Sequence, residues 1–174
     1  MNRTLLLAVA ALSACSSPPA PPATPTQTAT RTPPAILDRL TVKHRWDPAT
    51  GLIVSEEVVP LPAPLRDAPS LADAVARSQA TGVPVAAFTT ADRCAVCQQF
   101  KLSTLNDPRL VEFLAEGRVI GVHVEVDRDG EAAKQFLGDP AIPATYLLVP
   151  GEPPRRLAGL RNAGQVIEFL SGES

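Results

Sequence analysis

The sequence predicts an α/β fold in which a mixed β-sheet is flanked by helices and is preceded by a short strand pair. Two observations support this fold class. From residue 70 onward, short apolar runs bounded by turn residues alternate with amphipathic helical patterns, which is typical of a sheet with helices on both faces. The last two strand patterns follow each other without a helix, which indicates antiparallel strands. At 174 residues and 45% apolar content, the chain has room for one domain with its own core.

Charge and cysteine content narrow the function. The formal net charge is -2, and the sequence offers no basic patch for nucleic acid, so we expect no nucleic-acid partner. The only cysteines are Cys15, Cys94 and Cys97. This odd count indicates that one of them serves a purpose other than pairing.

The N-terminus has the pattern of a targeting segment. Arg3 precedes an apolar run over residues 5–12, which is too short to span a bilayer as a helix. The run ends in Leu-Ser-Ala-Cys at residues 12–15, which resembles the lipobox of bacterial lipoproteins. The resemblance implies a signal peptide over residues 1–14 and a lipidated Cys15, hence export and lipid anchoring on the periplasmic or extracytoplasmic side of a membrane. Ser16 then favours the outer membrane where the cell has one. The alternative is an ordinary secreted chain in which Cys15 is unmodified.

Two segments precede the main domain. Residues 15–34 are rich in proline and threonine and hold too little apolar surface to pack, so we interpret them as a linker. Residues 35–69 are predicted to form an extension with a strand pair, in which strands over 40–46 and 52–59 flank a turn at 47–51. The prolines at 60–69 are expected to break the chain before the next element.

The main domain is predicted over residues 70–174. Strands are expected over 83–88, 119–126, 144–149 and 155–158. Residues typical of helix starts are Ser70, Asp107 before Pro108, and Asn162 with Gln165. Further helices are expected from Cys94 onward and over 131–137.

A dithiol lies at the start of one of these helices. Cys94 and Cys97 follow the first strand of the domain after a short loop. With this spacing one thiolate can attack a substrate disulfide, and the other is close enough to resolve the mixed disulfide. Cys94, expected at the first helical position, is predicted to attack, because the helix N-terminus and neighbouring Arg93 both favour its thiolate. Cys97, one turn into the helix and partly buried, is predicted to resolve.

These features together resemble the thioredoxin superfamily, and within it the exported thioredoxin-like domains of bacterial thiol-disulfide interchange proteins. The resemblance covers about residues 70–170 and rests on the dithiol, the helix start at 106–108, and Ala-Ile-Pro at 141–143. It implies that Pro143 is a cis-proline beside the dithiol, a form that X-Pro bonds adopt at low cost. It also implies that the backbone of Ile142 contacts an extended substrate segment.

The sequence departs from the family in several positions. Arg93 stands where the family usually has tryptophan, Ala144 replaces a threonine, and Phe88 occupies the place of a buried acid that helps to move the proton of the second cysteine. His123 aligns with a lysine near that acid, and its ordinary pKa of about 6.5 suits a proton acceptor for Cys97. The alternative is that His123 is a structural polar residue on a sheet face.

The predicted function is therefore an exported, membrane-anchored thiol-disulfide oxidoreductase that acts on disulfides of envelope proteins, as a reductase rather than an oxidase. Its partners would be exported client proteins and a redox partner that recycles the dithiol. We expect no cofactor and no metal, since only His44 and His123 accompany the dithiol and they lie far apart in the sequence. Gln98 stands where haem attachment needs a histidine. The alternatives are a structural disulfide, and a non-catalytic thioredoxin-like binding module, a metal-delivery protein or a structural lipoprotein.

Overall fold

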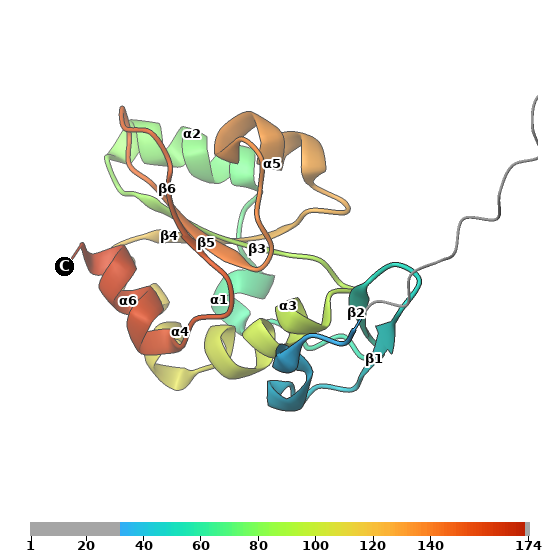
Figure 1. Ribbon diagram of the computed structural model, residues 1–174. Helices are drawn as coiled ribbons and strands as arrows, with labels where there is room; N and C mark the ends of the chain where they lie inside the picture. The colour runs from blue at the N-terminus through green and yellow to red at the C-terminus, as the bar shows by residue number, and fades with distance from the viewer. Residues whose placement is uncertain (1–31, 173–174) are drawn as a thin grey trace, which may run out of the picture.

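The computed structural model describes residues 32–172, and a four-stranded mixed sheet lies at their centre (Figure 1). Its strand order is β4-β3-β5-β6. The strand β3 (Val85–Thr90) runs parallel to β4 (Ile120–Glu125) and antiparallel to β5 (Ala144–Leu148). The strand β6 (Arg155–Ala158) pairs antiparallel with β5. The predicted mixed sheet, with its antiparallel strands last, is confirmed.

Helices cover both faces of this sheet (Figure 1). One face carries α2 (Leu71–Thr81) and α5 (Gly130–Leu137). The other face carries α1 (Ala63–Arg66), α3 (Ala95–Phe100), α4 (Pro108–Ala115) and α6 (Ala163–Ser171).

The side chains of β3 alternate between the two helical layers. Successive side chains of a strand point to opposite faces, and β3 is apolar on both. Val85 and Ala87 pack with the α2 and α5 layer, whereas Ala86 and Phe88 pack with the α3, α4 and α6 layer, and all four are fully buried. The C-terminal end of β3 is therefore held firmly from both sides, and the loop to the dithiol starts there.

The helix starts that the sequence predicted are confirmed by side-chain caps. Ser70 accepts a hydrogen bond from Asp73 N at the start of α2, and Asp107 accepts one from Arg109 N at the start of α4. Asn162 forms a full capping box with Gln165 at the start of α6. Such caps satisfy amides that have no partner within the helix.

The structure differs from the prediction in several places. The strand β3 lies about two residues later than expected, because Pro84 has no N–H for the ladder, and it extends to Thr90. The proline-rich stretch contains the short helix α1, since proline is tolerated in the first turn of a helix. The helix of the dithiol continues beyond α3 as one π-helical stretch, η2 (Lys101–Leu105).

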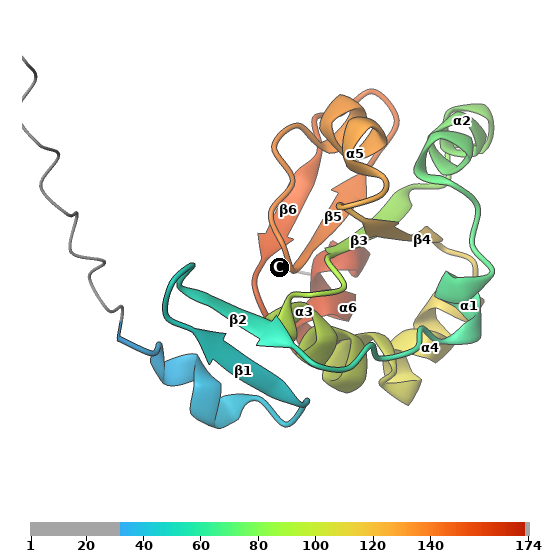
Figure 2. The same ribbon diagram turned by 90° about the vertical axis from the view of Figure 1, so that its right-hand side faces the viewer.

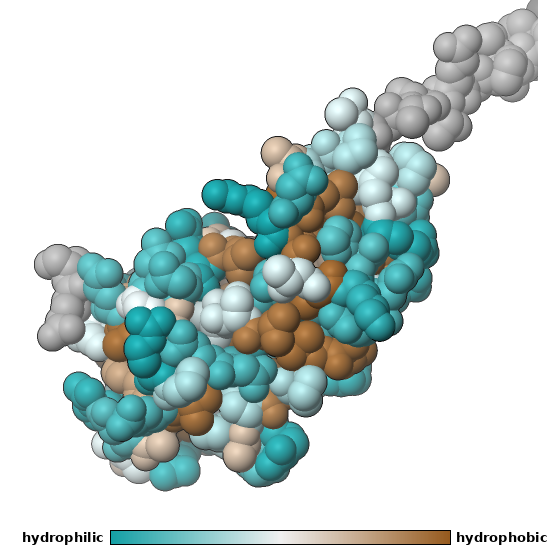
Figure 3. Space-filling view, turned by 90° about the horizontal axis from the view of Figure 1, so that it is seen from below, coloured by the Kyte–Doolittle hydropathy of each residue, from teal (hydrophilic) through white to brown (hydrophobic). Residues whose placement is uncertain are grey.

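The extension forms the predicted hairpin, with strands shorter than expected. The strand β1 (His44–Asp47) pairs antiparallel with β2 (Leu52–Ser55), and Gly51 closes the turn at a positive φ of 72°. A 3₁₀ helix, η1 (Ala35–Arg39), precedes the hairpin. The hairpin lies beside α3, apart from the main sheet (Figure 2). On the face drawn in Figure 3, the largest apolar areas lie toward the half of the molecule that carries the extension.

The predicted signal peptide, Cys15 and most of the linker lie outside the described residues. Over residues 32–172, no helix has the length and apolar character needed to cross a membrane.

Candidate functional site

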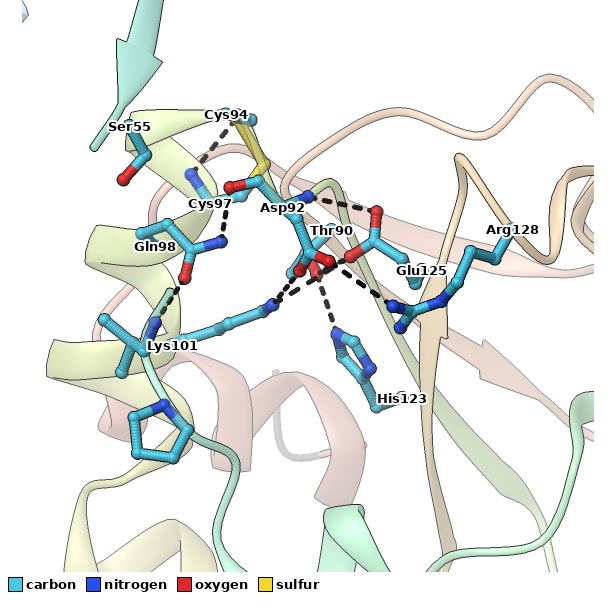
Figure 4. A network of polar contacts seen from close by, with 12 residues as sticks. Ser55, Thr90, Asp92, Cys94, Cys97, Gln98, Lys101, His123, Glu125 and Arg128 are labelled. Atoms are coloured by element: carbon cyan, nitrogen blue, oxygen red, sulfur yellow. Dashed lines mark hydrogen bonds and ion pairs between the residues drawn. A yellow bond between two sulfur atoms is a disulfide. The ribbon is translucent and has the colours of Figure 1, made fainter. Parts of the chain in front are cut away.

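Cys94 and Cys97 form a disulfide at the start of α3, with their Cα atoms 5.1 Å apart (Figure 4). Cys94 is the N-cap of this helix, one residue before the predicted position, because its backbone is extended (φ -84°, ψ 109°). Its Sγ accepts a hydrogen bond from Cys97 N at 3.2 Å. An amide that points at a sulfur from a helix N-terminus favours the thiolate of that cysteine in the reduced state.

The two cysteines differ in their access to solvent. Cys97 is fully buried, more than the sequence predicted, whereas Cys94 is half-buried and lines a surface cavity. An attacking sulfur must reach the substrate, so this geometry suits Cys94 for the first attack and Cys97 for resolution. Arg93 has an exposed side chain that lines the same cavity, and its effect on the Cys94 thiolate stays a prediction.

The loop before β5 contributes to the same cavity. The Ile142–Pro143 peptide bond is cis, as the resemblance implies. Pro143 is buried, whereas Ile142 is 41% exposed and lines the cavity together with Cys94. The Thr89 hydroxyl at the end of β3 donates to Ala141 O at 2.6 Å, which ties this loop to the strand that leads to the dithiol. Ile142 and Cys94 therefore line one cavity, and the contact of the Ile142 backbone with a substrate stays a prediction.

A buried ionic network lies behind the dithiol (Figure 4). Lys101 Nζ lies 3.2 Å from Asp92 Oδ1 and 3.9 Å from Glu125 Oε2, and the Lys101 and Glu125 side chains are 3% and 1% exposed. Asp92 N donates to Glu125 Oε1 at 3.1 Å, and Arg128 reaches Asp92 Oδ2 from the surface at 3.4 Å. Figure 4 shows Asp92 between the disulfide and Glu125. Buried charges persist only where they are paired and hydrogen-bonded, and both conditions are met here.

The two carboxylates of this network differ in their pKa. Burial, followed by the neighbouring Asp92 carboxylate, raises the pKa of Glu125 above its ordinary value. Burial also acts on Asp92, but the hydrogen bond and the charge of Lys101 outweigh it and lower the pKa of Asp92. Glu125 is therefore the stronger base of the pair.

His123 lies on β4, in register with Phe88, and its Nε2 is 2.7 Å from the Thr90 hydroxyl. Burial, and then the charge of Lys101, lower the pKa of His123 to about 4. The imidazole is neutral at pH 7 and is a weaker base than an ordinary histidine. Its predicted role as the proton acceptor for Cys97 stays a prediction.

Sequence reasoning missed Glu125, Lys101, Gln98 and Gln99. Gln98 and Gln99 directly follow Cys97, and both are buried. Gln98 Oε1 accepts from Val59 N at 2.7 Å, and Gln99 Oε1 accepts from Thr41 N at 2.7 Å. These two side chains attach the backbone of the extension to the dithiol helix. The sequence carries no local signal for this burial, because a helix that buries Cys97 and Phe100 places the two glutamines between them on its opposite face.

The residues that the structure describes include no ready metal site. Within 32–172, no three His, Cys, Asp or Glu side chains are grouped so that they could hold an ion. His44 Nδ1 lies 2.7 Å from Val42 O, which satisfies one nitrogen of its ring.

Comparisons with known proteins agree with this fold. Residues 67–150 match the model of a family described as thioredoxin-like. A search among curated proteins found no match. Similar solved structures include a thioredoxin from Thermus thermophilus (29% identity, 58% of this chain and 81% of that chain, TM-score 0.47). They also include a disulphide isomerase from Xylella fastidiosa Temecula1 (23%, 59% and 86%, TM-score 0.45) and the C-terminal domain of Neisseria meningitidis DsbD in the reduced form (20%, 59% and 92%, TM-score 0.46).

The chain thus carries a thioredoxin-like domain with a disulfide-forming cysteine pair at the start of α3. The matched residues include the dithiol and the cis-proline but not the hairpin at residues 44–55. This arrangement is consistent with thiol-disulfide oxidoreductase chemistry in general.

Proposed function

We propose that this protein is an exported, lipid-anchored thiol-disulfide oxidoreductase that reduces disulfides in proteins of the cell envelope. The observation that carries the proposal is the disulfide between a cavity-lining Cys94 and a fully buried Cys97 at a helix start. Export and anchoring rest on the lipobox-like sequence that ends at Cys15. The direction of reaction rests on the resemblance alone.

The proposed reaction has two exchange steps. In the reduced protein the Cys94 thiolate attacks one sulfur of the client disulfide, which forms a mixed disulfide and releases the first client thiolate. Cys97 then loses its proton and attacks Cys94 Sγ, which forms the Cys94–Cys97 disulfide and releases the second client thiolate. Two electrons pass from the dithiol to the client. A dithiol partner outside this chain must then reduce the disulfide for a second turnover.

The second step needs a base near the buried Cys97. His123 was predicted for this role, and Glu125 is the other candidate on β4. Burial makes His123 a weaker base and Glu125 a stronger one, because it disfavours the charged form of each. We therefore favour Glu125, in contact with Asp92 and Lys101, as the acceptor of the Cys97 proton.

Trapping of mixed disulfides tests this proposal. Cys97→Ala should accumulate covalent complexes with envelope proteins through Cys94, visible on non-reducing gels and lost on reduction. Cys94→Ala is the matched control and should accumulate few or none, because the sulfur that remains is fully buried. Equal trapping by both variants would contradict the assigned roles. Trapping by neither would favour a binding module that performs no exchange.

A further inference from the structure

The hairpin outside the family match is fixed against the reactive cysteine. Val54 of β2 forms an isolated antiparallel bridge with Cys94, and Ser55 N donates to Arg93 O at 2.9 Å. The last two residues of β2 thus contact the backbone of Arg93 and Cys94 directly. This pairing places the hairpin beside Cys94.

Packing and buried hydrogen bonds hold the extension in this position. Leu40, Val42 and Val59 form a small buried cluster with Ala95, which lies between the two cysteines. Gln98 Oε1 accepts from Val59 N, and Gln98 Nε2 donates to Asp92 O at 2.9 Å. Breaking such bonds would leave buried polar groups without partners, so they hold the segments that flank the hairpin against the dithiol helix.

The hairpin, the dithiol loop and the cis-proline loop enclose one cavity of about 600 Å³. This volume lies within the range of ligand-binding clefts, roughly 300–1,000 Å³. The hairpin contributes Leu52, Ile53 and Val54, the dithiol loop contributes Cys94 and Val96, and the cis-proline loop contributes Ile142. Leu52 is 60% exposed and Ile142 is 41% exposed, so the hairpin and the cis-proline loop each present a large apolar side chain that a ligand could cover.

The charges around the cavity favour one kind of occupant. Its lining includes the carboxylates of Asp47 and Asp127 and the single cation of Arg93. The hydrogen bond of Asp47 with Thr50, and then that with Ala49 N, lower the pKa of Asp47, so this carboxylate is charged at neutral pH. Small anionic disulfides would meet net repulsion, whereas an apolar peptide would not.

We propose that the hairpin is a specificity element: the groove between Leu52 and Ile142 binds an extended client segment with a bulky apolar side chain beside its cysteine. This inference rests on the proposed function and names its substrate class. The apolar client side chain covers Leu52 while the client sulfur faces Cys94. Residues 44–55 thus select protein disulfides in apolar segments over acidic ones.

The test compares two peptide disulfides of equal length, one with leucine and one with aspartate beside each cysteine, using the reduced full chain. Leu52→Asp should lower the ratio of kcat/KM for the leucine peptide to that for the aspartate peptide by about tenfold or more, since covering a leucine-sized side chain accounts for that factor. The control is Val58→Asp, which changes an apolar residue of the extension that is 64% exposed and does not line the groove. It should keep the wild-type ratio.

Binding of the same peptides with serine in place of cysteine tests the groove without any redox step. The wild-type chain should bind the leucine peptide at least about tenfold more tightly than the aspartate peptide, and Leu52→Asp should abolish the difference. Binding with this preference but without turnover would support the groove and contradict the proposed function. Turnover of both peptides without a preference for leucine would contradict the inference about the groove but not the proposed function. Dimerisation that rises with protein concentration and is lost in Leu52→Asp would assign the groove to a second copy and overturn the inference.

Discussion

Lys101 is the cation on which the buried network behind the dithiol depends. Replacing it with methionine keeps the length and apolar stem of the side chain but removes the charge that lies 3.2 Å from Asp92 and 3.9 Å from Glu125. Removing one partner of a buried ion pair costs roughly 3–5 kcal/mol, because the remaining charge is left uncompensated. Asp92 is 37% exposed and keeps its contact with Arg128, so we expect about 3 kcal/mol at pH 7.

The loss of stability in Lys101→Met should depend on pH in a defined direction. Lys101 opposes the burial that raises the pKa of Glu125, so this pKa rises further in Lys101→Met. A carboxyl whose pKa is higher in the folded than in the unfolded state destabilises the fold as the pH rises through that interval. The destabilisation of the variant should therefore be largest at pH 7 and smaller at pH 5, where more of Glu125 is protonated. Lys101 also helps to lower the pKa of His123, which should rise from about 4 in the variant.

Urea unfolding of the oxidised chain at pH 7 and pH 5 measures the destabilisation of Lys101→Met. An NMR titration of His123 measures the rise of its pKa. Arg128→Met is the matched control, since it removes the other cation that contacts Asp92, but from a side chain that is 67% exposed. Its cost should stay below about 1 kcal/mol. Equal losses in the two variants, or a loss in Lys101→Met that does not change with pH, would refute the account of a buried charge pair.

The remaining predictions concern the anchor and the proton of Cys97. Cys15→Ser should move the protein from the membrane fraction to the soluble fraction of its native host, and a variant that stays bound with unchanged gel mobility would argue against lipidation. Glu125→Gln should slow release of the mixed disulfide by about tenfold or more in rapid-mixing kinetics while leaving the attack by Cys94 nearly unchanged. His123→Phe should slow the same step less; a larger effect than that of Glu125→Gln would return the role to His123.

Local patterns in the sequence predicted much of the fold because they report short-range physics. The caps at Ser70 and Asn162 follow from the unpaired amides of any helix start, and each cap acts within three residues. The cis bond at Pro143 was implied by the resemblance and by the low cost of that form before proline. Element bounds were less accurate, as the later start of β3 shows, because the apolar run begins at Val83, before the hydrogen-bonded strand, and ends at Phe88, before its two threonines.

The buried polar residues of the site were missed for a different reason. Glu125 pairs with Lys101 across 24 positions in the sequence, and Gln99 receives its hydrogen bond from Thr41 across 58. Periodicity assigns polar side chains to solvent and contains no information about a segment that later covers them. Their burial was therefore visible only once the helix and the extension were packed together.

By itself the sequence indicated the mixed α/β fold, the dithiol at a helix start and, through a resemblance, the cis form at Pro143, since each depends on neighbours within a few residues or on a recognisable motif. Only the tertiary structure decided which cysteine is buried, that Glu125 is buried beside Asp92 and Lys101, and that the hairpin at residues 44–55 forms a wall of the cavity at Cys94. These properties arise from contacts between segments far apart in the chain. Desolvation and pairing act on a side chain only after such segments enclose it.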